Sequence, residues 1–212
     1  LINEKRHYAI NDEKLPSVTT ILSATQSQEK QDSLAKWKAK VGEKEAERVK
    51  NTAGARGTKM HSILEGYIEG KNVLDLTETG GEAHRMANTI INEGFKDLDE
   101  IWASEATLAY PGLYAGATDL VGIYQKRDSI IDFKQSNKPK KVEWIEDYKL
   151  QGAAYATAHD YMFKTNIEQI VILMCTPDCF FQRFIINGKE FREYKWKWLE
   201  RVNQYYEQRH DN

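Results

Sequence analysis

Asp132 and Lys134 lie in the segment IIDFK (residues 130–134), which otherwise has the apolar character of a buried strand. Because side chains alternate between the two faces of a strand, an acid and a base two positions apart lie on the same face. One interpretation is a salt bridge at the edge of a sheet, since charge pairs are common on strands. The other is a metal site with a catalytic lysine, and this segment alone leaves both open.

A second carboxylate, Asp119, lies in the strand-like segment that precedes this one. The polar stretch between them is too short for anything but a hairpin. With Lys126 and Arg127 as a two-residue turn, Asp119 lies across from Lys134. Shifting the register by two residues keeps Asp119, Asp132 and Lys134 on one face, whereas a shift by one separates them. Two carboxylates this close repel each other unless a cation lies between them, so the pattern favours a metal site.

Hydrophobic periodicity predicts the elements that position these residues. In about the first hundred residues it predicts four helices, at about 16–22, at 29–50, at 60–70 and after Gly80-Gly81 through Phe95. Gly54 and Gly57 are expected to loosen the chain before the third of these helices. β-branched and aromatic runs then predict strands at 101–110, 114–124, 129–134, 169–175 and 180–186, with helices at about 142–162 and 189–210. This order is typical of a mixed α/β layer fold.

The 212 residues contain 41% hydrophobic and 29% charged side chains, as in ordinary globular proteins, and show no repeat or linker. We expect a single domain, with 1–99 mainly helical over the active face and 100–212 forming a sheet core with flanking helices. No apolar run approaches the ~20 residues that span a bilayer. Two cysteines, Cys175 and Cys179, suit a reducing compartment. We therefore expect an intracellular, cytoplasmic protein, or an organellar one if a leader precedes Leu1.

Five short motifs occur in a suggestive order: LPSVTTIL, GTKMHSILEG, AGATDLVGIY, DFKQSNKPK and DYKLQGAAYATAHD. Asp119, followed by Asp132-x-Lys134 on the next strand, resembles the active-site signature of the PD-(D/E)xK nuclease superfamily. The whole set is similar to the RecB-like branch, in particular to its mitochondrial and viral exonucleases. The resemblance implies a restriction-endonuclease-like core, a mixed central β-sheet flanked by helices, with an N-terminal helical elaboration. Some relatives carry four cysteines that hold an iron–sulfur cluster, and because this chain has two, no cluster is expected. Gln135 follows the lysine at a position where many relatives have a small hydroxyl residue.

The resemblance also implies a Mg²⁺ or Mn²⁺ ion held by Asp119 and Asp132. The backbone carbonyl of Phe133 and the imidazole of His61 are further ligands. Carboxylate and carbonyl oxygens suit Mg²⁺, and a histidine extends the choice to Mn²⁺. Glu65 lies one helical turn after His61, where it is a candidate to reach a second metal or to orient the histidine, the alternative being a solvated glutamate. Glu105, on the first strand, is a similar candidate.

Three residues complete the catalytic set that the resemblance implies. Lys134 is expected to orient the attacking water and to stabilise negative charge in the transition state. Gln151 and Tyr155 lie four positions apart on one helical face, where both are able to position phosphate or water. The alternative for this pair is structural, with Tyr155 in the core and Gln151 at its rim.

A net charge of −2 gives no overall attraction to nucleic acid, so DNA binding must depend on local clusters. The candidate phosphate contacts are Arg56, Lys59, Lys138, Lys140 and Lys141. Trp37, Tyr114 and Trp144 are candidate stacking surfaces for bases. These features predict a metal-dependent exonuclease that prefers single-stranded DNA ends, with no membrane or obligate protein partner. The alternatives are a flap or junction endonuclease, a non-catalytic DNA-end binding module and an α/β scaffold protein.

An exonuclease without a motor must select DNA ends by geometry. We expect the segments around 29–50 and 80–99 to arch over the metal site and to leave a passage for one strand.

Overall fold

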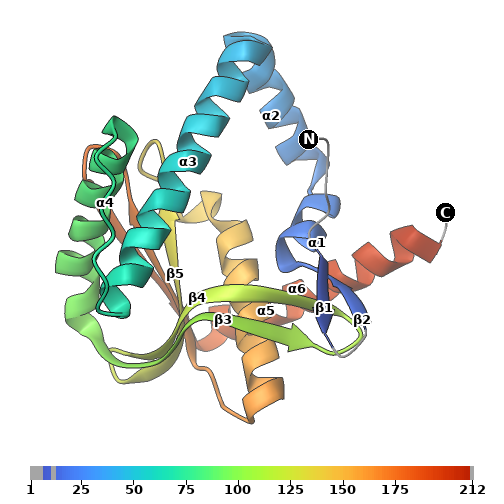
Figure 1. Ribbon diagram of the computed structural model, residues 1–212. Helices are drawn as coiled ribbons and strands as arrows, with labels where there is room; N and C mark the ends of the chain where they lie inside the picture. The colour runs from blue at the N-terminus through green and yellow to red at the C-terminus, as the bar shows by residue number, and fades with distance from the viewer. Residues whose placement is uncertain (1–6, 11–12, 211–212) are drawn as a thin grey trace.

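The hairpin that carries the predicted acids lies in the middle of a five-stranded sheet. The computed structural model describes residues 7–10 and 13–210 (Figure 1). In spatial order the strands are β3 (Leu98–Tyr110), β4 (Tyr114–Tyr124), β5 (Arg127–Gln135), β6 (Gln169–Cys175) and β7 (Phe181–Asn187). Among the described strands only β5 and β6 pair in parallel, because the helix α5 (Glu146–Phe163) crosses over between them.

Helices cover both faces of the sheet. One face packs against α3 (Glu43–Ile68) and α4 (Glu78–Gly94); the other packs against α1 (Val18–Ala24), α5 and α6 (Gly188–His210). Strand alternation separates the two cores: along β5, Ile131 and Phe133 join the first and Ile130 the second. Short 3₁₀ turns η1 (Phe95–Asp97) and η2 (Val142–Trp144) precede β3 and α5. None of the described helices is long and apolar enough to span a membrane.

The hairpin turn differs from the predicted one. Tyr124 pairs with Arg127, so the turn residues are Gln125 and Lys126, not Lys126 and Arg127. Both turn residues have positive φ values, 48° and 64°, as a two-residue turn matched to strand twist requires. The backbone N–H of Gln125 donates to the carbonyl oxygen of Asp97, just before β3, and that of Lys126 donates to the carboxylate of Asp99 at the start of β3. The register is shifted by two residues, which leaves every side chain on its predicted face.

The N-terminal helices also differ from the prediction in their boundaries. The predicted helix at 29–50 is two helices, α2 (Gln28–Val41) and α3, which meet at Gly42 with φ +86°. A residue with a side chain is strained at that φ, so glycine suits this turn. Gly54 and Gly57 do not loosen the chain but lie inside α3, whose packing against α4 holds the helix. An unpredicted hairpin, β1 (His7–Ile10) and β2 (Glu13–Pro16), precedes α1.

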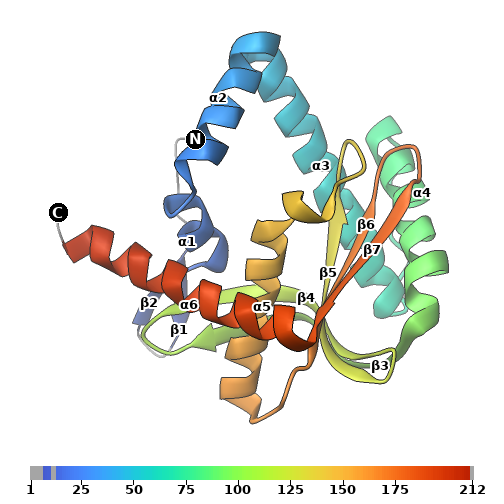
Figure 2. The same ribbon diagram turned by 180° about the vertical axis from the view of Figure 1, so that it is seen from behind.

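The α2 and α3 helices form an arch, visible from both sides in Figures 1 and 2. The base of α2 is tied to the body by an ion pair between Lys30 and Asp147 at the start of α5. The apolar residues of α2 remain exposed: Leu34, Trp37 and Val41. The other predicted arch segment, 80–99, is not part of it. Its helix α4 packs beside α3 over β6, because Ala83, Met86 and Ile90 are buried in that core.

Candidate active site

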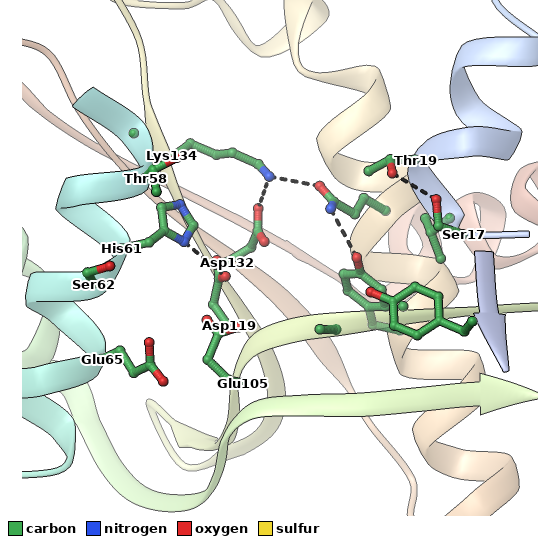
Figure 3. A pocket seen from close by; sticks show the side chains of 17 residues that line it. Ser17, Thr19, Thr58, His61, Ser62, Glu65, Glu105, Asp119, Asp132 and Lys134 are labelled. Atoms are coloured by element: carbon green, nitrogen blue, oxygen red, sulfur yellow. Dashed lines mark hydrogen bonds and ion pairs between the residues drawn. The ribbon is translucent and has the colours of Figure 1, made fainter. Parts of the chain in front are cut away.

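The predicted acids, the lysine and the histidine line one pocket of about 460 Å³ (Figure 3). The sheet contributes Asp119, Asp132 and Lys134, α3 contributes His61, and α5 contributes Gln151 and Tyr155. Residues of α1, at the foot of the α2 leg of the arch, complete the wall opposite α3. The pocket therefore lies between the two legs of the arch.

Asp119 is held by two donors from different elements. His61 Nδ1 lies 3.1 Å from Asp119 Oδ1, and the backbone N–H of Phe133 donates to Asp119 Oδ2 at 2.7 Å. Burial alone would raise the pKa of Asp119, but the hydrogen bond and charge of His61 lower it below its usual value. Burial likewise opposes the charged form of His61, and the carboxylates overcome this and raise its pKa. The raised pKa of His61 and the lowered pKa of Asp119 both favour a contact between a charged imidazole and a carboxylate.

Asp132 is almost fully buried, with 3% of its surface exposed. Its Oδ2 atom lies 2.6 Å from Lys134 Nζ as an ion pair, yet it accepts no hydrogen bond of good geometry from the described residues. Burial raises the pKa of Asp132 to about 7, with Asp119 adding to the effect and Lys134 opposing it. A buried carboxylate oxygen that accepts no hydrogen bond of good geometry is suited to bind a cation.

Lys134 connects the sheet to α5. Its Nζ donates to Gln151 Oε1 at 2.8 Å, and Gln151 Nε2 donates to the Tyr155 hydroxyl at 3.1 Å. Burial disfavours the ammonium, but Asp132 and Asp119 raise the pKa of Lys134 above its usual value. Tyr155 is only 3% exposed, and it lines the pocket with its hydroxyl hydrogen-bonded to Gln151. Tyr155 therefore packs in the core with Gln151 at its rim, as the structural interpretation expected, and the positioning of phosphate or water by this pair stays a prediction.

Gly116 on β4 makes room for the Tyr155 ring. A Cβ atom at position 116 would lie 2.7 Å from Tyr155 Cε1, closer than non-bonded atoms approach. We expect Gly116→Ala to displace Tyr155, to loosen Gln151 and to cost about 1–3 kcal/mol of stability. Thermal unfolding measures the cost. Gly54→Ala on α3, where a Cβ meets nothing within 4 Å, is the control and should not destabilise. Equal stability of the Gly116→Ala variant and the wild type would contradict the prediction.

The donor set fits a divalent cation. Ligand atoms of His61, Glu105 and Asp119 all lie within 4.8 Å of one another, and the buried oxygen of Asp132 lines the same pocket. Carboxylate oxygens with one imidazole match the preferences of Mg²⁺ and Mn²⁺.

Two of the predicted DNA contacts are engaged inside the protein. Arg56 is 8% exposed, lies 2.8 Å from Glu82 and also donates to Asn137. Lys59 contacts Asp75 at 2.5 Å and Thr77 at 2.8 Å. Arg56 is too buried to meet a phosphate as the sequence suggested, whereas Lys59 is paired at the surface with residues of the segment before α4. The sequence pattern did not reveal these partners.

The three lysines after β5 are different. Lys138 and Lys141 are exposed and Lys140 is half-buried, and none of them forms an ion pair with a carboxylate among the described residues. The loop is braced by Gln182 on β7, whose side-chain amide accepts the N–H of Lys140 at 2.8 Å and donates to its carbonyl at 2.9 Å. These lysines are available to phosphates in a fixed loop.

The predicted stacking residues also separate into two groups. Tyr114 is fully buried, donates to the carbonyl of Ala154 and packs edge-on against Trp198, so it is a core residue and cannot stack on a base. Trp37 and Trp144 are exposed, and the ammonium of Lys141 lies over the ring of Trp144.

Several lining residues were missed by sequence reasoning. Tyr8, Ser17 and Thr19 close the pocket on the side of α1. Ser17 caps α1 by accepting the N–H of Thr20 and forms a bridge with Ala115 of β4, which holds this wall against the sheet. The Ser17-Val18-Thr19-Thr20 segment indicated a helix start but gave no sign that it faces the acids.

The class of fold is shared with a solved structure. No family model matches the chain. The crystal structure of "Putative exonuclease" from Eubacterium rectale superposes with a TM-score of 0.52 at 15% identity, covering 70% of this chain and 64% of that one. This likeness confirms the predicted α/β fold with a mixed five-stranded sheet flanked by helices.

The particular relatives are mitochondrial. Mitochondrial genome maintenance exonuclease 1 is similar over most of the chain: 28% identical over 204 residues in Mus musculus and 26% over 205 in Homo sapiens. These matches cover 91% and 92% of this chain but 59% of each relative's length. The Xenopus tropicalis protein is 29% identical over 168 residues, 74% of this chain and 48% of the relative. The resemblance to PD-(D/E)xK-like nucleases that the motifs predicted is confirmed by this similarity and by the fold.

Proposed function

We propose that the chain is a metal-dependent DNA exonuclease of the RecB-like branch that acts on single-stranded ends. The observation that carries the proposal is the meeting of Asp119, Asp132 and Lys134 with His61 and Gln151 in one pocket. Similarity to proteins named exonucleases supports hydrolysis of nucleic acid. An intracellular role in DNA repair, replication or recombination belongs to the same proposal.

His61, Asp119, Asp132 and the carbonyl of Phe133 would hold Mg²⁺ or Mn²⁺. When bound, the ion would neutralise charge on the scissile phosphate and on the leaving oxygen. Lys134 contributes a buried ammonium whose direction is set by Asp132 and Gln151, so it is oriented before substrate arrives. It would hold the attacking water and stabilise the negative charge that develops on the phosphate. Gln151 keeps Lys134 in place through its own contact with Tyr155.

The arch supports a preference for DNA ends. A pocket between α1 and α3 beneath joined helices is suited to a strand that enters by its end. Lys138, Lys140 and Lys141 lie after the catalytic strand, and burial together with the charge of Lys30 on α2 lowers the pKa of Lys140. The exposed Lys138 and Lys141 would follow a phosphate backbone and make binding salt-dependent.

The proposal is tested with four substrates of one sequence: end-labelled linear single strands, circular single strands, linear duplex and linear RNA. Each is incubated with Mg²⁺, Mn²⁺ or chelator. We expect linear single-stranded DNA to be degraded in either metal, circles to survive because they have no end to thread, and chelator to stop all cleavage.

Other outcomes assign the alternatives. Rapid nicking of the circles at the same enzyme concentration removes the threading model and supports an endonuclease. Binding of DNA ends without cleavage in either metal supports a non-catalytic module. If the protein neither binds nor cleaves DNA, the scaffold interpretation remains.

A further inference from the structure

Glu105 lies directly across β3 and β4 from Asp119. The flanking pairs are Ser104 with Leu120 and Ala106 with Thr118, so the register is unbroken at this position. Ligand atoms of His61, Glu105 and Asp119 lie within 4.8 Å of one another. Figure 3 shows Glu105 beside Asp119 on the side of the pocket that faces α3. A third carboxylate thus joins the two that the active-site signature contains.

The Glu105 backbone is held in an unfavourable conformation. Its φ is +49°, although it lies in the middle of a strand and is not a glycine. The irregularities of this strand pair lie elsewhere, between Leu98 and Ala103. A left-handed residue with a Cβ costs about 1–2 kcal/mol, so the surrounding strands maintain this conformation at a cost.

The charges around Glu105 are not balanced by the protein. Glu105 forms no ion pair with any residue in the described ranges, and like charges directly opposite on neighbouring strands are destabilising. Lys134 is engaged by Asp132, and His61 is engaged by Asp119. Glu65 of α3 adds a further acid to the same pocket.

A separate observation points to a ligand in the pocket. Asp132 Oδ2 is buried, lines the same pocket and accepts no hydrogen bond of good geometry from the described residues. The one charged contact of this oxygen is the Lys134 ammonium at 2.6 Å, while Asp119, Glu105 and Glu65 line the same pocket. Four carboxylates share the pocket with one lysine and one histidine, and such an excess of negative charge is expected where a hard cation completes the site.

We propose that Glu105 is a metal ligand, which together with His61 and Asp119 holds a divalent cation on the β3 side of the pocket. The inference deepens the proposed nuclease function and rests on it. It assigns to the metal centre a carboxylate from β3 that the Asp119, Asp132-x-Lys134 signature does not contain.

The test is Mn²⁺ binding to the metal-free protein without DNA, measured by isothermal titration calorimetry. Glu105→Gln removes the charge and keeps the size, and Glu105→Gly also relieves the positive φ, so it should fold at least as well as the wild type. Both variants should bind Mn²⁺ at least tenfold more weakly than the wild type. Glu47→Gln is the matched control, because it removes a charge from an exposed position of α3 outside the pocket; it should weaken binding less than threefold.

Wild-type affinity in both Glu105 variants would overturn the inference, as would an equal loss in Glu47→Gln, which would indicate a general effect of negative charge. Failure of the wild type to bind Mn²⁺ would overturn it too. Cleavage assays separate this result from the fate of the proposed function. Metal binding that depends on Glu105 without nuclease activity refutes the function alone. Nuclease activity together with metal binding that does not depend on Glu105 refutes the inference alone.

Discussion

Replacement of Asp132 by asparagine is expected to abolish DNA cleavage and to change how the stability of the metal-free protein depends on pH. The amide is a poor ligand for a hard cation. Loss of metal assistance removes several kcal/mol of transition-state stabilisation, which corresponds to roughly a thousandfold or more in rate. Asp119→Asn should have the same effect on rate. Near-normal turnover by either variant in Mg²⁺ would contradict a two-acid site.

The pH effect follows from the buried position of Asp132. Burial raises the pKa of this carboxyl to about 7, whereas an unfolded aspartic acid titrates near 4. The folded protein therefore binds this proton more tightly than the unfolded chain does. Below about pH 4 both states are protonated; as the pH rises from about 4 to about 7 the wild type loses stability. In Asp132→Asn this loss should be absent. Thermal unfolding in chelator across this range measures it, and identical pH profiles would contradict the assignment.

Replacement of Lys134 by alanine should slow the chemical step far more than it weakens DNA binding. One well-placed electrostatic donor contributes about 3–4 kcal/mol to the transition state, so the single-turnover rate should fall by roughly two to three orders of magnitude. Affinity for DNA should fall much less, because the exposed lysines of the following loop still meet phosphates. Single-turnover cleavage and equilibrium binding in Ca²⁺ provide the two measurements.

Lys138→Ala is the matched control for that experiment. Lys138 is exposed in the loop after β5, outside the residues that line the pocket, so its removal should weaken binding and lower the salt dependence by about one counterion. A loss of binding in Lys134→Ala as large as its loss of rate would make Lys134 a phosphate anchor.

The sheet and the central acids were predictable from sequence for a clear reason. Strands rich in β-branched residues and bounded by turn residues have recognisable ends, and β4 begins and ends where predicted, at Tyr114 and Tyr124. The hairpin register was wrong by two residues because Gln125-Lys126 is not a typical turn pair. Contacts from Asp97 and Asp99 hold it, and these are tertiary. The period of two along a strand made the error harmless, so Asp119, Asp132 and Lys134 share a face as predicted.

Other features could not be read from local patterns. The burial of Arg56 depends on Glu82, a residue of another helix, and a basic residue beside a histidine gives no sign of that partner. The helix α4 lies beside α3 because the apolar side chains of both pack in the same core, and the sequence pattern does not indicate which face of the sheet a helix covers. The strand position of Glu105 became informative only when the register placed it opposite Asp119.

The parallel pairing of β5 with β6 has a consequence for the order of folding. The β4–β5 hairpin is local, so we expect it to form early, and we expect β6 to join β5 only after the crossover helix α5 has docked, because non-local pairing is slow. His61 meets Asp119 across 58 residues of chain. In a partly folded molecule the hairpin therefore brings its two acids together before Lys134 is oriented and before the histidine arrives. The proposed activity should appear late in refolding, when α3 and α5 dock, so that incompletely folded molecules leave DNA intact.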